Sequence, residues 1–242
     1  MIIIPDTHGR TFWKKAVEQA KENEKIIFLG DYVDPYCEID PYTKNAISTK
    51  SALDNFKDII DYAKEHSNVI LLVGNHDTEY FLGTYKCRCD YKNFDCLKKL
   101  FLDNINLFKI GYYEVIDNKK YVFSHSCIKK GWLEQFDVNL KSPQEVIDYC
   151  NEMLQTNQEQ LGKELDAISY VRGGDMRYGS IVWADASEFD DEEWDGCDTY
   201  FIFGHTQQRN QPVIEENFAL LDCRKAFRLE NNRLIIITTE QI

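Results

Sequence analysis

The alternation of apolar runs and helical patterns in the first third of the chain is the feature that most restricts its fold. Residues 2–4, 25–29 and 68–73 are apolar runs typical of buried strands, and residues 11–22 and about 48–65 have helical patterns. Strands that alternate with helices form βαβ units, in which the strands are parallel. We therefore predict an α/β fold with parallel strands near the N-terminus.

Further strands are predicted in the rest of the chain. Residues 111–116 and 120–124, joined through "DNKK", are typical of a hairpin, and three later strands are expected at 199–203, 218–222 and 234–239. This number of strands predicts a two-sheet β-sandwich flanked by helices.

A polar, helix-forming stretch at 142–170 lies between these strands. Ser142 is the expected N-cap, Pro143 the first helical residue, and Glu145 completes a capping-box pattern. We see no repeat or Gly/Ser linker that would divide the 242 residues. We therefore expect one domain over residues 1–242, with a helical insert at about 126–180.

Composition narrows the classes of partner. Hydrophobic residues make up 43% of the chain, which is too many for a disordered protein, and the formal net charge of -13 argues against binding to a nucleic-acid backbone. No apolar run approaches the 18 or so residues of a membrane span, and the N-terminus has no signal-peptide pattern. We expect a cytoplasmic protein that does not bind membranes.

The eight cysteines are expected to be reduced thiols in that compartment. Cys87, Cys89 and Cys96 are close in sequence, but a structural zinc site needs a fourth ligand and a paired C-x-x-C spacing, and neither is visible. Ordinary semi-buried thiols are the favoured interpretation.

A residue of metal-ligand type follows each of five apolar runs. These residues are Asp6 and His8, Asp31 and Asp34, Asn75 with His76 and Asp77, His125, and His205. The carboxyl ends of parallel strands meet at one edge of a sheet, where ligands bind. Four of the five histidines of the chain occupy these positions, which favours a shared functional site over unrelated roles.

Each position also has a structural interpretation when it is taken alone. Asp6 could cap a helix, Asp31 or Asp34 could form a turn, and His76 or His125 could be a hydrogen-bonded core histidine. Together, however, these interpretations require five coincidences at equivalent strand ends.

Mixed Asp, His and Asn donors suit Mn²⁺, Fe or Zn²⁺ better than Ca²⁺ or Mg²⁺, which prefer oxygen ligands. The candidates are too many for one ion. A bridging carboxylate would let two ions lie roughly 3.5–4 Å apart.

The order D-x-H, G-D-x-x-D, G-N-H-D/E, H, G-H resembles the signature of calcineurin-like metallophosphoesterases. The chain has "DTH", "GDYVD", "GNHD", "SHS" and "GHT" in these places, over residues 6 to 205. The short spacing and "SIVWAD" at 180–185 resemble the phosphoprotein phosphatase branch, particularly its small bacterial and phage members.

The resemblance implies a role for each matching residue. Asp6 and His8 would hold the first metal ion, Asp31 would bridge, and the second ion would be held by Asn75, His125 and His205. His76 would be the general acid, oriented by Asp34.

One departure concerns the phosphate-binding arginine. The branch usually has this arginine directly after G-D-x-V-D, where the chain has Pro35 and Tyr36. The candidates to replace it are Arg10, Arg172 and Arg177.

The resemblance implies hydrolysis of phosphate monoesters by in-line attack of a metal-bound hydroxide, with two divalent ions, most simply Mn²⁺. The expected activity is that of a Ser/Thr protein phosphatase acting on a phosphorylated protein or a small phosphoester. One alternative is a phosphodiesterase or pyrophosphatase acting on dinucleoside polyphosphates or cyclic nucleotides. Another is a catalytically silent binding module, which the presence of every ligand and of His76 disfavours.

Overall fold

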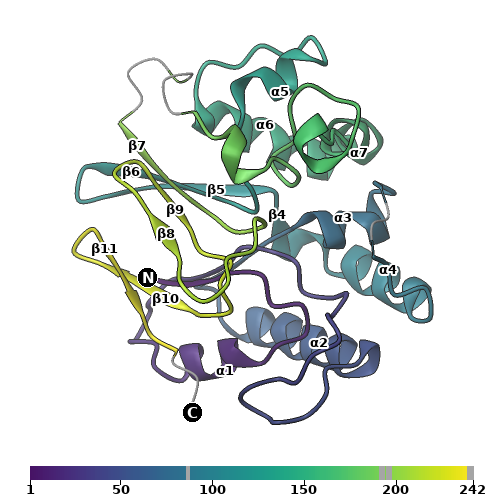
Figure 1. Ribbon diagram of the computed structural model, residues 1–242, viewed down its shortest axis with the longest axis vertical. Helices are drawn as coiled ribbons and strands as arrows, with labels where there is room; N and C mark the ends of the chain where they lie inside the picture. The colour runs from purple at the N-terminus through teal and green to yellow at the C-terminus, as the bar shows by residue number, and fades with distance from the viewer. Residues whose placement is uncertain (86–87, 191–193, 195–197, 239–242) are drawn as a thin grey trace.

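Two mixed sheets form the centre of the computed structural model, which describes residues 1–85, 88–190, 194 and 198–238 (Figure 1). The first sheet has the strand order β11-β10-β1-β2-β3-β4 and the second has the order β5-β6-β7-β9-β8. Helices α1 and α2 lie on one side of the pair of sheets, and α5, α6 and α7 lie on the other (Figure 1). The predicted α/β sandwich flanked by helices is confirmed.

The parallel strands predicted from the sequence form the middle of the first sheet. They are β1 (Ile2–Ile4), β2 (Ile26–Phe28), β3 (Val69–Leu72) and the short β4 (Phe108–Lys109). Each pairs in parallel with the next. An antiparallel hairpin of β10 (Phe227–Glu230) and β11 (Arg233–Ile236) extends this sheet beside β1. The expected strand at 234–239 corresponds to β11; residue 239 lies outside the described residues.

The second sheet contains the predicted hairpin. Its strands are β5 (Gly111–Ile116), β6 (Lys119–Ser124), β7 (Thr199–Phe203), β8 (Val213–Ile214) and β9 (Phe218–Leu220). Strands β6, β7 and β9 are parallel, and β5 and β8 run antiparallel to them. The β5–β6 turn places Asp117 and Asn118 at φ 49° and 63°, as a type I′ turn requires.

The helices agree less closely with the sequence pattern. α1 (Phe12–Val17) is shorter than expected, because tighter i→i−3 turns follow it, in which Gln19 N–H donates to Ala16 O and Ala20 N–H to Val17 O. α2 (Thr49–Glu65) agrees with the expected helix at about 48–65 and is capped by Ser48, whose side chain accepts from Ser51 N–H. Two helices were not predicted, α3 (Asn75–Phe81) and α4 (Phe94–Asp103). Short 3₁₀ segments occur at Ile105–Leu107, Tyr170–Arg172 and Ala186–Glu188.

The long helical stretch predicted at 142–170 is divided. After α5 (Lys130–Glu134), α6 (Pro143–Thr156) ends at Asn157, whose side chain caps α7 (Gln158–Leu165). Ser142 caps α6 by accepting from Glu145 N–H. The expected capping box is incomplete, since the Glu145 carboxylate accepts from Lys141 N–H instead.

Alternate residues of the central strands face two apolar layers. Ile3 and Ile27 belong to the core that includes residues of both sheets, whereas Ile2 and Phe28 belong to the larger core that includes α1 and α2 residues. Burial on both faces explains why these strands are continuous apolar runs. They end together in the loops that carry the candidate site. Among the described residues, no helix has the length and apolarity needed to cross a bilayer.

Candidate metal centre

Five strand-end loops bring six side chains into one connected group. We call Asp6, His8, Asp31, Asn75, His125 and His205 the strand-end cluster. His125 Nε2 lies 3.1 Å from Asn75 Oδ1 and 3.2 Å from His205 Nδ1. The backbone N–H of His205 donates to both carboxylate oxygens of Asp6, at 3.3 and 3.2 Å. Except for the partly buried His205, all members are buried.

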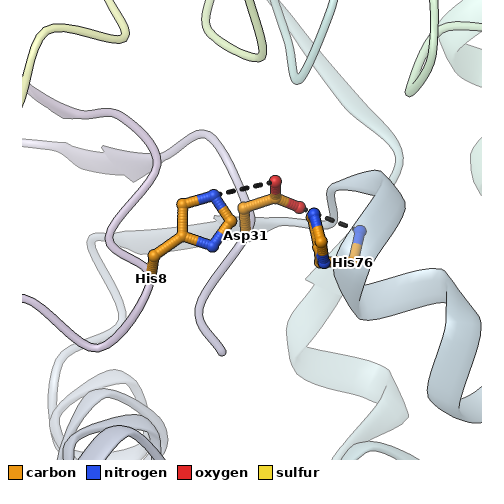
Figure 2. A group of neighbouring side chains, drawn as sticks. All are labelled: His8, Asp31 and His76. Carbon is orange, nitrogen blue, oxygen red and sulfur yellow. Dashed lines mark hydrogen bonds and ion pairs between the residues drawn. The ribbon is translucent and has the colours of Figure 1, made fainter. Parts of the chain in front are cut away.

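Asp31 occupies the middle of the cluster. Its Oδ2 lies 3.4 Å from His8 Nε2 and 3.5 Å from His125 Nε2, and its Oδ1 accepts from the backbone N–H of His76 at 3.0 Å. Figure 2 shows the carboxylate between His8 and His76. One carboxylate therefore faces two imidazoles that come from different sheets.

Backbone carbonyls orient these two imidazoles. His8 Nδ1 donates to Val33 O, and His125 Nδ1 donates to Leu29 O, both at 2.9 Å. With Nδ1 protonated, each Nε2 presents its lone pair toward Asp31. Burial lowers the pKa of His8, His125 and His205, so all three are neutral at pH 7 and suited to bind a cation. The donors therefore fit divalent metal ions. Ligand atoms of Asp6, Asp31 and His125 lie within 4.8 Å of one another, as do those of His8, Asp31 and His76, so that Asp31 belongs to both groups.

His76 lies beside the cluster and is held by Asp34. Its Nδ1 is 2.9 Å from Asp34 Oδ2, and the other carboxylate oxygen of Asp34 accepts from Tyr80 OH and from Asp90 N–H. Burial lowers the pKa of His76, but the charge of Asp31 and the hydrogen bond to Asp34 outweigh it and raise the pKa to about 9. The imidazole is therefore protonated at neutral pH in this structure.

The backbone of the site is unusual. His8, Asp31, Asp34 and His205 have φ values of 43°, 54°, 55° and 64°, in the left-handed region. Glycines make the close approach of the loops possible: a Cβ at Gly204 would lie 2.1 Å from Asp6 Oδ1. Such conformations are costly and persist only where the surrounding structure enforces them.

Asp77 helps to hold these loops in place, a role that was not predicted from the sequence. Its Oδ2 accepts from the N–H groups of Asp31 at 2.7 Å and Gly74 at 2.8 Å, and its Oδ1 accepts from Tyr32 N–H at 3.0 Å. It ties the loop after β2 to the loop after β3. Its position in the first turn of α3, typical of an N-terminal capping carboxylate, is the sequence signal that could have identified it.

Arg88 and Tyr36 were also missed. Arg88 donates from Nε and Nη2 to Asp34 O, at 3.2 and 2.7 Å, and its guanidinium carbon lies 3.6 Å from the centre of the Tyr36 ring. The Tyr36 ring contacts His8 edge-on at 5.0 Å. No pattern could have indicated Arg88, because it follows no strand and lies in an irregular segment.

Of the three arginines predicted to bind phosphate, two lie next to the strand-end cluster. Arg10 is buried, with Nε 2.5 Å from Glu38 Oε1 and Nη1 near Asp6 O at 3.4 Å. Arg172 donates from Nη2 to Thr206 Oγ1, next to His205, and its Nε lies 2.9 Å from Asp185 Oδ2. Both therefore adjoin the cluster.

Arg177 is exposed and does not join the cluster. Its guanidinium lies 5.0 Å from the centre of the Tyr178 ring, and its backbone N–H donates to Gln135. Among the contacts between described residues, we find none that links Arg177 to the strand-end cluster.

A cavity of about 570 Å³ lies beside the cluster. It is lined by Tyr85, Asp166, Ile168, Arg172, Gly173, Gly174, Asp175 and Trp183. Trp183 connects it to the site, since its ring lies 5.8 Å from the ring of His205.

Of the three clustered cysteines, Cys87 lies outside the described residues. Cys89 is half-buried and Cys96 is exposed. Among the described residues, neither belongs to a group that could hold a metal ion.

Comparisons with known proteins agree with this geometry. The sequence matches the calcineurin-like phosphoesterase family over residues 1–209, and a comparison with curated proteins finds no match. The fold is similar to that of a cold-active protein-tyrosine phosphatase of a psychrophile, Shewanella sp. That likeness has a TM-score of 0.56 and 17% identity, and it covers 97% of this chain and 76% of the other. The chain therefore belongs to the calcineurin-like phosphoesterase family, whose members are normally metal-dependent hydrolases.

Proposed function

We propose that this chain is a binuclear metal-dependent phosphatase that hydrolyses phosphate monoesters, with phosphorylated protein segments as its substrates. The observation that carries the proposal is the position of Asp31. Its Oδ2 lies within hydrogen-bonding or bridging reach of Nε2 of both His8 and His125, at 3.4 and 3.5 Å. A single carboxylate placed between two neutral imidazoles suits a bridge between two cations.

The strand-end cluster supplies ligands for both ions. Asp6 and His8 would hold one ion, Asp31 would be shared, and Asn75, His125 and His205 would hold the other. The mixed oxygen and nitrogen donors favour Mn²⁺, with Fe or Zn²⁺ as substitutes. Two divalent ions bound there would lower the pKa of a water molecule and neutralise the oxygens of a phosphate ester.

His76 donates the proton that the leaving alkoxide requires. Its Nδ1 is occupied by Asp34, so the proton available for transfer is on Nε2. Asp34 is itself fixed by Tyr80 OH and Asp90 N–H, which keeps the imidazole in one orientation. A carboxylate that fixes a histidine in this way also raises its pKa, which keeps the acid protonated until transfer.

The adjoining cavity favours a peptide substrate. It has aromatic walls formed by Tyr85 and Trp183, and two carboxylates, Asp166 and Asp175, line it with Arg172. A basic residue that flanks a phosphorylated side chain would find an acidic partner there. The net charge of -13 supports the same preference by attracting basic segments.

The test compares hydrolysis by Mn²⁺-loaded protein across p-nitrophenyl phosphate, bis-p-nitrophenyl phosphate, dinucleoside polyphosphates and phosphopeptides. We expect activity on monoesters, with the highest kcat/KM on phosphopeptides. His76→Asn should lower kcat by about 10²- to 10⁴-fold while both Mn²⁺ ions are retained. His66→Asn is the matched control, because His66 ends α2 and bonds to Tyr62 O.

Three outcomes would contradict the proposal. Full activity of His76→Asn would remove the proton-donor role. A preference for diesters or dinucleoside polyphosphates would show that phosphate monoesters are not the substrate class. Inactivity of the wild type toward every ester, with Mn²⁺, Fe²⁺ and Zn²⁺ each supplied, would indicate a catalytically silent binding module.

A further inference from the structure

Three arginines place positive charge next to the strand-end cluster, and two of them are already paired with a carboxylate. The charges of Arg10 and Arg88 act on His8, and the charge of Arg172 acts on His205. Arg10 is paired with Glu38 at 2.5 Å, and Arg172 with Asp185 at 2.9 Å. A guanidinium that already holds a carboxylate has less to offer a second anion.

Arg88 is held differently. Both hydrogen bonds that fix it end on one neutral acceptor, the backbone oxygen of Asp34. In the part of the chain that the structure describes, it forms no ion pair with a carboxylate. A guanidinium has five N–H donors, so most of its donors remain for another partner.

Tyr36 fixes the plane of this guanidinium. The guanidinium carbon lies 3.6 Å from the ring centre, a close stacking contact, and the same ring contacts His8 at its edge. Arg88 is thus linked on one side to His8, through Tyr36, and on the other to His76, through Asp34. Its charge is held between a candidate metal ligand and the proposed proton donor, with no carboxylate of the described residues paired to it.

We propose that Arg88 binds the phosphate group of the substrate, and that Tyr36 is the residue that positions it. The proposal rests on the proposed function, because it names the residue that holds the phosphoryl oxygens at the same site. A planar guanidinium matches two phosphate oxygens with parallel N–H bonds, which a lysine cannot reproduce. Stacking on Tyr36 orients the fork before substrate arrives, so less ordering is required on binding.

The test measures binding of inorganic phosphate to the metal-loaded protein by calorimetry, together with KM for p-nitrophenyl phosphate and bound Mn²⁺ by elemental analysis. Arg88→Ala should raise the Kd for phosphate about tenfold to a hundredfold, with Mn²⁺ content unchanged. Arg88→Lys, which keeps the charge but loses the fork, should recover only part of the loss. Arg233→Ala, an exposed arginine on β11, is the control and should bind phosphate as the wild type does.

Tyr36 gives a second, independent arm. Tyr36→Phe keeps the stacking ring and should bind phosphate normally, whereas Tyr36→Ala should weaken binding by less than Arg88→Ala does. The Tyr36→Ala change should have little further effect in the Arg88→Ala background, because the ring acts through the guanidinium.

Unchanged phosphate binding in Arg88→Ala would overturn the proposal, as would loss of Mn²⁺ from that variant or failure of the wild type to bind phosphate. Failure of the proposed function is distinguishable, since it would appear as a wild type that binds phosphate but hydrolyses no ester.

Discussion

Left-handed backbone conformations occur in two kinds of place in this molecule. Asp117, Asn118, Asn231 and Asn232 adopt them in exposed hairpin turns, and His8, Asp31, Asp34 and His205 adopt them in the candidate metal centre. In the turns, Asn and Asp are present because they tolerate left-handed backbone conformations best. In the candidate metal centre, the residues are present for their side-chain donors, and the left-handed backbone directs those side chains toward one another.

The two sets also differ in what maintains them. The hairpin turns need no support from other segments, because the backbone of a type I′ turn matches the twist of the two strands that it joins. The conformation of Asp31 is maintained from outside, by Asp77 accepting from its N–H and by the close contact between Gly30 and Gly74. The strained backbone conformation of Asp31 is therefore maintained by contacts between loops that are far apart in sequence.

The largest expected difference between the two sets is functional. Asp31→Asn keeps a side chain that tolerates positive φ but removes the shared charge, so we expect fewer bound Mn²⁺ ions and a kcat/KM lower by at least about a hundredfold. Asp117→Asn makes the same chemical change at φ 49° in a turn and should alter neither quantity. Elemental analysis and steady-state kinetics on both variants check this. Equal effects at the two positions would break the distinction.

The next effect concerns pH and Asp34. In the metal-free protein the pKa of His76 is raised from 6.5 to about 9, so its stabilising contribution is complete below pH 6.5 and is lost as pH rises through 9. Asp34→Asn removes one of the charges responsible, so its stability should fall less over this range than that of the wild type. Urea unfolding at pH 6, 7.5 and 9.5 measures the slopes.

Asp137→Asn is the control for that series. Asp137 is exposed and has φ 61°, so the variant should keep the wild-type dependence on pH. A wild-type slope in Asp34→Asn would show that Asp34 does not hold the proton on His76.

The smallest expected effect concerns the left-handed backbone conformation that both sets of residues adopt. Glycine avoids the steric penalty of positive φ, which for other residues is roughly 1–2 kcal/mol. The free energy of unfolding of His8→Gly should therefore be about 1 kcal/mol higher than that of His8→Ala. The free energy of unfolding of Asn118→Gly should be higher than that of Asn118→Ala by a similar amount. Denaturant unfolding of the four metal-free variants gives both differences. A difference near zero at His8 would mean that its backbone is not strained.

The sequence predicted the parts of the site that are local. An apolar run followed by Asp6, Asp31 or His125 marks the end of a buried strand, and parallel strands bring such ends together whatever the intervening segments do. The two sheets followed from the same pattern. The hairpin turn at Asn118 was likewise visible in "DNKK".

What could not be predicted depends on contacts between distant segments. Nothing near Arg88 indicates that it stacks on Tyr36, because that contact forms only after the loops after β2 and α3 meet. Arg10 was a candidate to bind the phosphate, and its pairing with Glu38 is a tertiary contact that no local pattern indicates. The break at Asn157 has a different, local cause: both flanking segments favour helix, and they are separated by the non-helical backbone of Asn157 (φ -150°, ψ 71°), whose side chain accepts from Gln160 N–H.

Anomalous diffraction at the manganese edge from crystals of the Mn²⁺-loaded protein tests most directly whether Asp31 lies between two metal ions. We expect two peaks roughly 3.5–4 Å apart, with Asp31 contacting both, His8 contacting one and His125 the other. A single peak, or manganese bound away from the strand-end cluster, would contradict this expectation.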